Sequence, residues 1–252
     1  MNTPVLDVGA ILPMIVVATG AVLMPLLEVL LARMIKQKRT WLSRPMTREL
    51  AGTMMAFASA LVLGTALIFT LGGFLTPDRV FNASHPMIKM DLMALFLNAV
   101  VLLAAIMTVL ISIRYLAELR NNRGEYYALL LASVLGMMLL TAAVELLMLF
   151  LALELMTIPV YALAGYQRGS LRSNESAIKY FVIGSFASAI LLYGIALVYG
   201  ASGTLALDVI GQTGFDEENT VASVGAGLVL VGLAFKIGGA PFHQWAPAVY
   251  EG

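Results

Sequence analysis

The sequence predicts an all-α integral membrane protein, a polytopic bundle of about seven transmembrane helices in which the seventh is discontinuous. Of its 252 residues, 60% are hydrophobic and only 12% are charged, against roughly 45–50% and 25% in soluble domains. The apolar residues also form charge-poor stretches of about 20 residues, the length that crosses a bilayer as a helix. A domain of this size cannot bury so much apolar surface, so lipid must cover much of it.

The expected spans follow from these stretches in chain order. The first three are expected at 8–27, 50–77 with a helix end near Gly72–Gly73, and 92–113. The apolar stretch between Glu125 and Arg168 would reach roughly 63 Å as one helix, about twice the bilayer core. We therefore expect two helices there, joined by a turn near 142–145. The sixth span is expected at 175–200, and the seventh begins near Val221 and is interrupted at 238–241.

The composition excludes several kinds of chemistry. The chain has no cysteine, which excludes disulfides, thiolate nucleophiles, cysteine-ligated zinc and iron–sulfur clusters. The two histidines, His85 and His243, are too few for a histidine metal cluster. Fifteen basic residues balance fifteen acidic ones, so no basic excess indicates a nucleic-acid partner. We expect neither a cofactor nor a metal bound to this chain.

Lysine and arginine are distributed unevenly among the loops, which predicts the orientation. Eleven of them lie in the loops 33–48, 114–125 and 168–174. The opposite side carries Arg79 and Lys89 together with acidic residues around 208–218. Because loops rich in Lys and Arg stay in the cytoplasm, we expect these three loops to be cytoplasmic and the N-terminus to be periplasmic. For a multi-pass protein this is the orientation expected in a bacterial inner membrane, with the N-terminus in the periplasm or an equivalent space.

Glu154 lies near the middle of the expected fifth span, where an ionisable group costs about 2.5–3.5 kcal/mol on insertion scales. Thr157 and Tyr161 follow it at helical spacing and give the helix one polar face. Pro159 removes a backbone donor and frees a carbonyl nearby. An intramembrane acid is a candidate for an ion or proton pathway, and the alternative is a structural carboxylate bonded to a neighbouring helix.

Lys236 lies deep in the seventh span, on the same face as glycines at 225, 232 and 239 and directly before the interruption. Broken membrane helices occur where the backbone lines a cavity. Burial favours the uncharged forms of both lysine and glutamate, so Glu154 and Lys236 suit proton exchange. Lys179 is paired in sequence with Glu175, four residues before it, and spacing alone leaves its role open. His243, in a Pro-Phe-His sequence, is a further proton-relay candidate.

Four segments resemble the antiporter-like subunits of respiratory complex I. RGEYYALLLASVLGMML (123–139) is similar to the fourth helix of that family, and LFLALELMTIPVYALAGY (149–166) to the fifth. ESAIKYFVIGSFASAILLYGIALVYGASG (175–203) resembles the sixth helix, and LAFKIGGAPFHQWAPAVYEG (233–252) the broken seventh. The match covers most of residues 90–252. The EYYALL and YGIALVYG sequences resemble the subunit N branch more than the subunits L and M.

The resemblance implies a membrane subunit of a proton-translocating NADH:quinone oxidoreductase, with the family's acid at Glu154 and its lysines at Lys179 and Lys236. It implies no redox centre in this chain, since NADH, FMN, the iron–sulfur clusters and quinone belong to other subunits. The implied partners are neighbouring antiporter-like subunits and the lipid bilayer. The implied organisation is an N-terminal three-helix segment, 1–122, and a first antiporter-like repeat, 123–252, truncated within the seventh helix.

The family continues through a second, inverted repeat, so we expect this chain to be a fragment or a truncated protein. Two other functions share its motifs. One is a subunit of a multi-subunit cation/proton antiporter, and the other is a structural fragment that does not pump.

Overall fold

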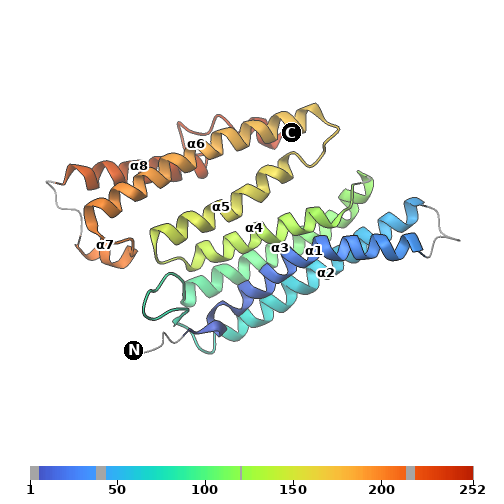
Figure 1. Cartoon of the computed structure of the whole chain (residues 1–252), viewed down its shortest axis with the longest axis horizontal. Helices are drawn as coiled ribbons and strands as arrows, with labels where there is room; N and C mark the ends of the chain where they lie inside the picture. Colours follow the sequence, from blue (N-terminus) through green and yellow to red (C-terminus); the bar gives the residue numbers. More distant parts are fainter. Residues whose placement is uncertain (1–5, 38–43, 120, 214–218, 252) are drawn as a thin grey trace.

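The structure is a computed structural model that describes residues 6–37, 44–119, 121–213 and 219–251. Long helices run side by side along one axis (Figure 1). A 3₁₀ turn, η1 (Val8–Ile11), precedes the first of them. The long helices are α1 (Leu12–Gln37), α2 (Arg44–Gly73), α3 (Leu92–Glu118), α4 (Gly124–Ala142), α5 (Leu146–Ala164) and α6 (Leu171–Ser202). The shorter elements are α7 (Leu207–Thr213), α8 (Thr220–Lys236), α9 (Ala246–Tyr250), β1 (Arg79–Val80) and β2 (Lys89–Met90).

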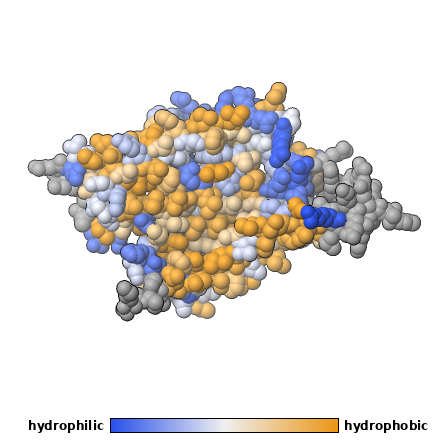
Figure 2. Space-filling view, in the orientation of Figure 1, coloured by the Kyte–Doolittle hydropathy of each residue, from blue (hydrophilic) through white to orange (hydrophobic). Residues whose placement is uncertain are grey.

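The fold class expected from the sequence is confirmed. In the part of the chain that the structure describes, six helices are long and apolar enough to cross a membrane, and α8 is a shorter apolar helix. Figure 2 shows a surface that is largely apolar between its two ends, with hydrophilic residues gathered toward one end. The helices extend beyond the expected windows. For example, α1 continues to Gln37, because the polar end of a membrane helix does not need apolar residues to keep its backbone hydrogen-bonded.

The turn expected near 142–145 is confirmed, since α4 ends at Ala142 and α5 begins at Leu146. The extended residues between them are held by neighbouring loops. Ala143 forms a bridge with Ile88, and Glu145 forms one with Ala206. The short hairpin of β1 and β2, and helix α7, were not expected, because segments this short carry too little hydrophobic periodicity to be recognised.

Helices α1 to α4 pack into a bundle whose core contains large, fully buried side chains such as Leu63, Leu102 and Tyr127. Helix α5 packs beside α4, and α6 beside α5 (Figure 1). A smaller cluster around Leu146, Leu153 and Leu191 joins these helices to α8.

Helices α6 and α8 approach each other closely through glycines. A Cβ at Gly225 would lie 2.9 Å from the backbone N of Val198, and one at Gly232 would lie 2.6 Å from Leu191 Cβ. Glycine is therefore required at both positions for the two helices to pack at this distance. The glycine face predicted beside Lys236 thus serves a tight helix contact.

The predicted interruption of the seventh helix is confirmed. Helix α8 ends at Lys236, and Gly238 adopts the left-handed conformation with φ of 63°, which favours glycine. The chain then turns and forms the short helix α9. The backbone amides of Gly238 and Gly239, in the turn between α8 and α9, donate to carbonyls of the last turn of α8. The break thus leaves Lys236 at a helix C-terminus, where the helix dipole favours a positive charge.

The connections α1–α2, α3–α4 and α5–α6 lie together at one end of the molecule, and α9 lies at this same end (Figure 1). We call it the basic-loop end, because these three connections contain the basic loops 33–48, 114–125 and 168–174. Residues 38–43 and 120 lie outside the described part. The described residues of the three loops therefore share one end, as the charge distribution predicts.

Candidate functional site

The centre of the site is an ion pair between two helices. Lys236 Nζ of α8 lies 2.9 Å from Glu154 Oε1 of α5. The lysine side chain is 6% exposed and the glutamate side chain 21%. Glu154 is the ninth of the nineteen residues of α5, close to the helix midpoint. The two charges that the sequence placed deep in the membrane therefore neutralise each other, and each lowers the cost of burying its partner.

Ser188 of α6 completes a three-membered polar cluster with this pair. Its hydroxyl donates to Glu154 Oε1 at 2.5 Å and accepts from Lys236 Nζ at 2.8 Å. The same hydroxyl lies 2.9 Å from the carbonyl of Gly184, one turn earlier. The Ser188 hydroxyl has one hydrogen and two acceptors in reach. It can therefore donate that hydrogen either to Glu154 or to the helix backbone.

The polar face predicted for α5 is confirmed by its contacts. Thr157 Oγ1 lies 3.5 Å from Lys236 Nζ, and the Tyr161 hydroxyl lies 3.4 Å from it. The Thr157 hydroxyl also donates to the Leu153 carbonyl at 2.8 Å. Lys236 therefore has oxygen acceptors on two helices in addition to its carboxylate partner.

Close helix packing positions these groups. A Cβ at Gly184 would lie 2.1 Å from the Tyr161 hydroxyl, so a larger residue there would displace the tyrosine ring from its present position. A Cβ at Gly136 of α4 would lie 2.3 Å from the backbone N of Met156, two residues after Glu154. The Ser133 hydroxyl also donates to the Met156 carbonyl at 3.0 Å. Helix α4 thus fixes the section of α5 that carries the acid.

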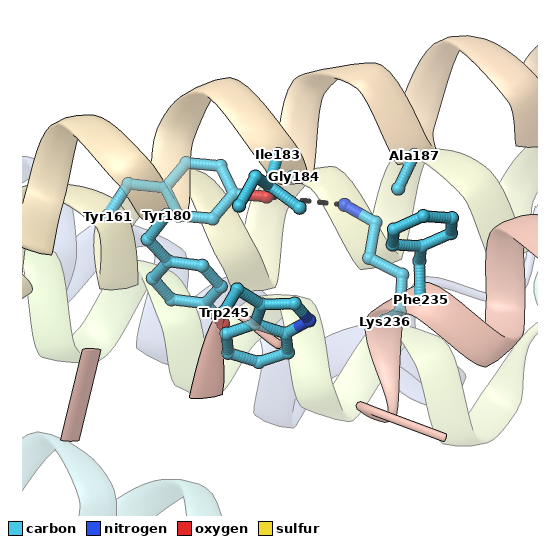
Figure 3. Close-up of a pocket in the computed structure, with 8 residues that line it drawn as sticks. All are labelled: Tyr161, Tyr180, Ile183, Gly184, Ala187, Phe235, Lys236 and Trp245. Carbon is cyan, nitrogen blue, oxygen red and sulfur yellow. Dashed lines mark hydrogen bonds between the residues drawn. The ribbon is translucent and has the colours of Figure 1, made fainter. Parts of the chain in front are cut away.

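A small pocket opens onto Lys236 (Figure 3). Its walls come from α5, α6, α8 and the segment after the break, and its lining residues are Tyr161, Tyr180, Ile183, Gly184, Ala187, Phe235, Lys236 and Trp245. The pocket has room for roughly one water molecule. The Tyr161 hydroxyl points across it toward Lys236 Nζ (Figure 3).

The structure brings together two of the four predicted site residues. Lys179 lies in the first third of α6, where its side chain is 50% exposed and pairs with Glu175 at 2.5 Å. It is not part of the Glu154–Lys236 cluster. His243 is exposed and lies in the turn between α8 and α9. Ser188 was missed, since a serine in an apolar helix ordinarily bonds its own backbone and gives no distinctive sequence signal.

The cluster is suited to moving a proton over short distances. A carboxylate, a hydroxyl and an ammonium group lie within 2.9 Å of one another, so small displacements change which group holds the proton. Within residues 6–37, 44–119, 121–213 and 219–251, no group of three or more His, Asp or Glu side chains is arranged to hold a metal ion.

Comparison with known proteins shows which membrane proteins this chain is similar to. Residues 143–252 match the transmembrane region described for NADH:quinone oxidoreductase/Mrp antiporter proteins. NADH-quinone oxidoreductase subunit N 1 of Sorangium cellulosum is 40% identical over 251 residues, covering 96% of this chain and 48% of that protein. The chain thus spans about half the length of the curated relatives it matches.

Solved structures show the same fold. A chain of respiratory complex I from Thermus thermophilus, solved with bound aureothin, has a TM-score of 0.72 and 33% identity, covering 95% of this chain and 47% of that one. A chain of the Mrp complex from Dietzia has the same TM-score at 21% identity, covering 97% and 44%. The second likeness concerns the fold alone. The resemblance to complex I subunits noted in the sequence is confirmed.

Proposed function

We propose that the chain is part of a proton-translocating membrane subunit of an NADH:quinone oxidoreductase, because residues 143–252 match the NADH:quinone oxidoreductase/Mrp antiporter membrane family. In this function the chain carries protons and holds no redox centre. The energy comes from electron transfer in other subunits, and moving one charge against 100 mV requires about 2.3 kcal/mol.

The observation that carries the proposal is the buried pair of Glu154 and Lys236, joined by Ser188. A pair of this kind is bistable. With both groups charged, their attraction holds the proton on the lysine, and transfer to the carboxylate leaves two neutral groups that bury at lower cost. A conformational change that separates the two helices would therefore break the contact through which the proton passes.

The test is proton pumping by the membrane complex that contains the full-length subunit. Glu154→Gln keeps the size of the side chain but removes its charge, so we expect NADH-driven acidification of inverted membrane vesicles to fall severely. Electron transfer from NADH to an artificial acceptor, measured in the same vesicles, controls for assembly. Normal acidification by Glu154→Gln at equal complex content would overturn the proposal.

A second candidate function is cation/proton exchange, because the family description includes Mrp antiporters and the fold matches an Mrp complex. In that function a sodium gradient, without NADH, would drive proton movement through the Glu154–Lys236 cluster. The 40% identity to a subunit named for NADH-quinone oxidoreductase favours the first function. Proton movement that needs sodium and is indifferent to NADH would favour the second.

The remaining assignments follow from the first function. The subunit lies in a bacterial inner membrane with the basic-loop end in the cytoplasm and the N-terminus in the periplasm, beside other membrane subunits. NADH, FMN, iron–sulfur clusters and quinone bind elsewhere in the complex. Residues 1–122 form a three-helix segment, and residues 123–252 form the first part of the antiporter-like repeat. Lys179 and His243 are outlying members of the proton pathway.

A further inference from the structure

The segment after the helix break folds back over the pocket beside Lys236. Trp245 stacks on Tyr180 of α6, with ring centroids 4.7 Å apart and an interplanar angle of 11°. Tyr180 in turn meets Tyr161 edge-on at 4.6 Å. These three rings form a continuous series from α9 to Lys236, and all three line the pocket (Figure 3).

The pocket offers polar partners for a water molecule. Lys236 Nζ lies in its wall, and the Tyr161 hydroxyl reaches across it. A bound water requires two to four polar partners and about the volume present here. Such a water would extend the Glu154–Ser188–Lys236 cluster toward the basic-loop end, because Tyr180 and Trp245 lie on that side of Lys236, near the start of α6 and at α9.

The segment after the break contacts α6 through an ion pair and an aromatic stack, and the end of α8 through a second aromatic pair. An exposed ion pair joins Arg172 at the start of α6 to Glu251 at 2.6 Å, and each side chain is about two thirds exposed. Exposed pairs of this kind contribute little to stability. The Tyr180–Trp245 stack attaches the segment to α6 beside the pocket, and Phe242 stacks on Phe235 of α8 with ring centroids 4.1 Å apart. The left-handed Gly238 and the non-helical residues before Ala246 interrupt the helix and supply a point of bending.

We propose that the Tyr180–Trp245 stack is a movable lid over a water site beside Lys236, and that its opening admits water to Lys236 from the basic-loop end. The inference rests on the proposed function, because water admitted by the open lid supplies the proton that Lys236 relays. The closed stack separates Lys236 from bulk water, and the open stack connects the two. The lid therefore governs when the lysine can exchange its proton with the cytoplasm.

Thiol labelling tests the lid without measuring transport. The chain has no cysteine, so Ala187→Cys places a single thiol of this chain in the pocket wall. In membranes containing the complete complex, the charged, membrane-impermeant reagent 2-sulfonatoethyl methanethiosulfonate is added from the cytoplasmic side and its attachment to this chain is followed. Because only the hydrated thiolate reacts, the rate reports water access.

Trp245→Ala in the Ala187→Cys background should speed labelling by about two- to tenfold, the range expected for loss of one aromatic pair. Trp245→Phe retains an aromatic face and serves as the matched control, with a rate near that of the parent. If Trp245→Ala does not accumulate in the membrane, Tyr180→Leu removes the other ring and should give the same acceleration. Equal rates in the ring-deleted and parent proteins would overturn the lid, as would acceleration confined to reagent added from the periplasmic side.

The two proposals fail in different ways. Faster labelling in Trp245→Ala, combined with proton pumping that is insensitive to Glu154→Gln, would overturn the proposed function and leave the lid. Unchanged labelling combined with severe loss of pumping in Glu154→Gln would remove the lid and leave the function.

Discussion

Ser188→Ala is the substitution that tests the geometry of the site most specifically. The change deletes one buried hydroxyl that donates to Glu154 at 2.5 Å and accepts from Lys236 at 2.8 Å. A hydrogen bond to a charged group contributes about 1.5–3 kcal/mol. The backbone carbonyl of Gly184 stays bonded within its helix, so the loss falls on the ion pair.

If the hydroxyl orders the pair for proton transfer, losing about 1.5–3 kcal/mol slows pumping by roughly tenfold to a hundredfold. Ser185→Ala is the matched control, since it removes an exposed hydroxyl from the same helix three residues away. Acidification of inverted vesicles is measured after addition of NADH, with NADH oxidation by an artificial acceptor as the measure of intact complex. Pumping by Ser188→Ala within twofold of Ser185→Ala would refute the reasoning.

Three further predictions concern helix packing, pH and orientation. Gly136→Ala should lower the amount of folded subunit in the membrane, because the added Cβ would lie 2.3 Å from the backbone of α5. Gly64→Ala is the control, since the space around its Cβ is open and the amount should not change. Immunoblotting of membranes compares the two variants. The Arg79 guanidinium, hydrogen-bonded to Asp7, holds the pKa of that carboxyl below its ordinary value of 3.8. The stability this pair gives is therefore present above pH 3.8 and is lost as pH falls through the lowered pKa. In Asp7→Asn, the melting temperature should fall less steeply with pH at the acid end of the range. An unchanged dependence of the melting temperature on pH would contradict this. In a chain without native cysteine, Gly169→Cys should react with an impermeant reagent only from the cytoplasmic side and Ser84→Cys only from the periplasmic side, and the reverse pattern would invert the proposed topology.

The sequence was sufficient to predict the long helices, because each needed only a long apolar stretch bounded by charge or glycine. The turn at 142–145 followed from length alone, since one helix over that region would exceed the bilayer. The break after Lys236 followed from the consecutive glycines and Pro241, whose backbone preferences are local. These features depend on neighbouring residues in the chain, so the sequence carries them directly.

The candidate site could be predicted only in part. Glu154 and Lys236 were found because a charge in an apolar span is costly wherever the helices pack. That they form a direct pair depends on the distance between α5 and α8. Both helices pack on α6, α5 at Gly184 and α8 through Gly232, by contacts far apart in the sequence. Ser188 was missed for the same reason, since its partners lie 34 and 48 residues away.

Lys179 shows the limit of spacing arguments. The ion pair between Lys179 and Glu175 follows from helical spacing and is present, at 2.5 Å. Spacing says nothing about which side of α6 faces the cluster, and the structure places Lys179 on an exposed side. The stack of Tyr180 on Trp245 joins residues on either side of α8, so no local pattern could have indicated it.

The measurement that tests the central claim most directly compares Lys236→Arg with Lys236→Ala in the assembled complex. Arginine keeps the positive charge opposite Glu154 but stays protonated at all physiological pH values, so it can hold the ion pair and cannot relay a proton. We expect NADH-driven proton pumping to be lost in both variants while electron transfer to an artificial acceptor continues. Normal pumping by Lys236→Arg would show that the residue is a fixed charge and would contradict the account.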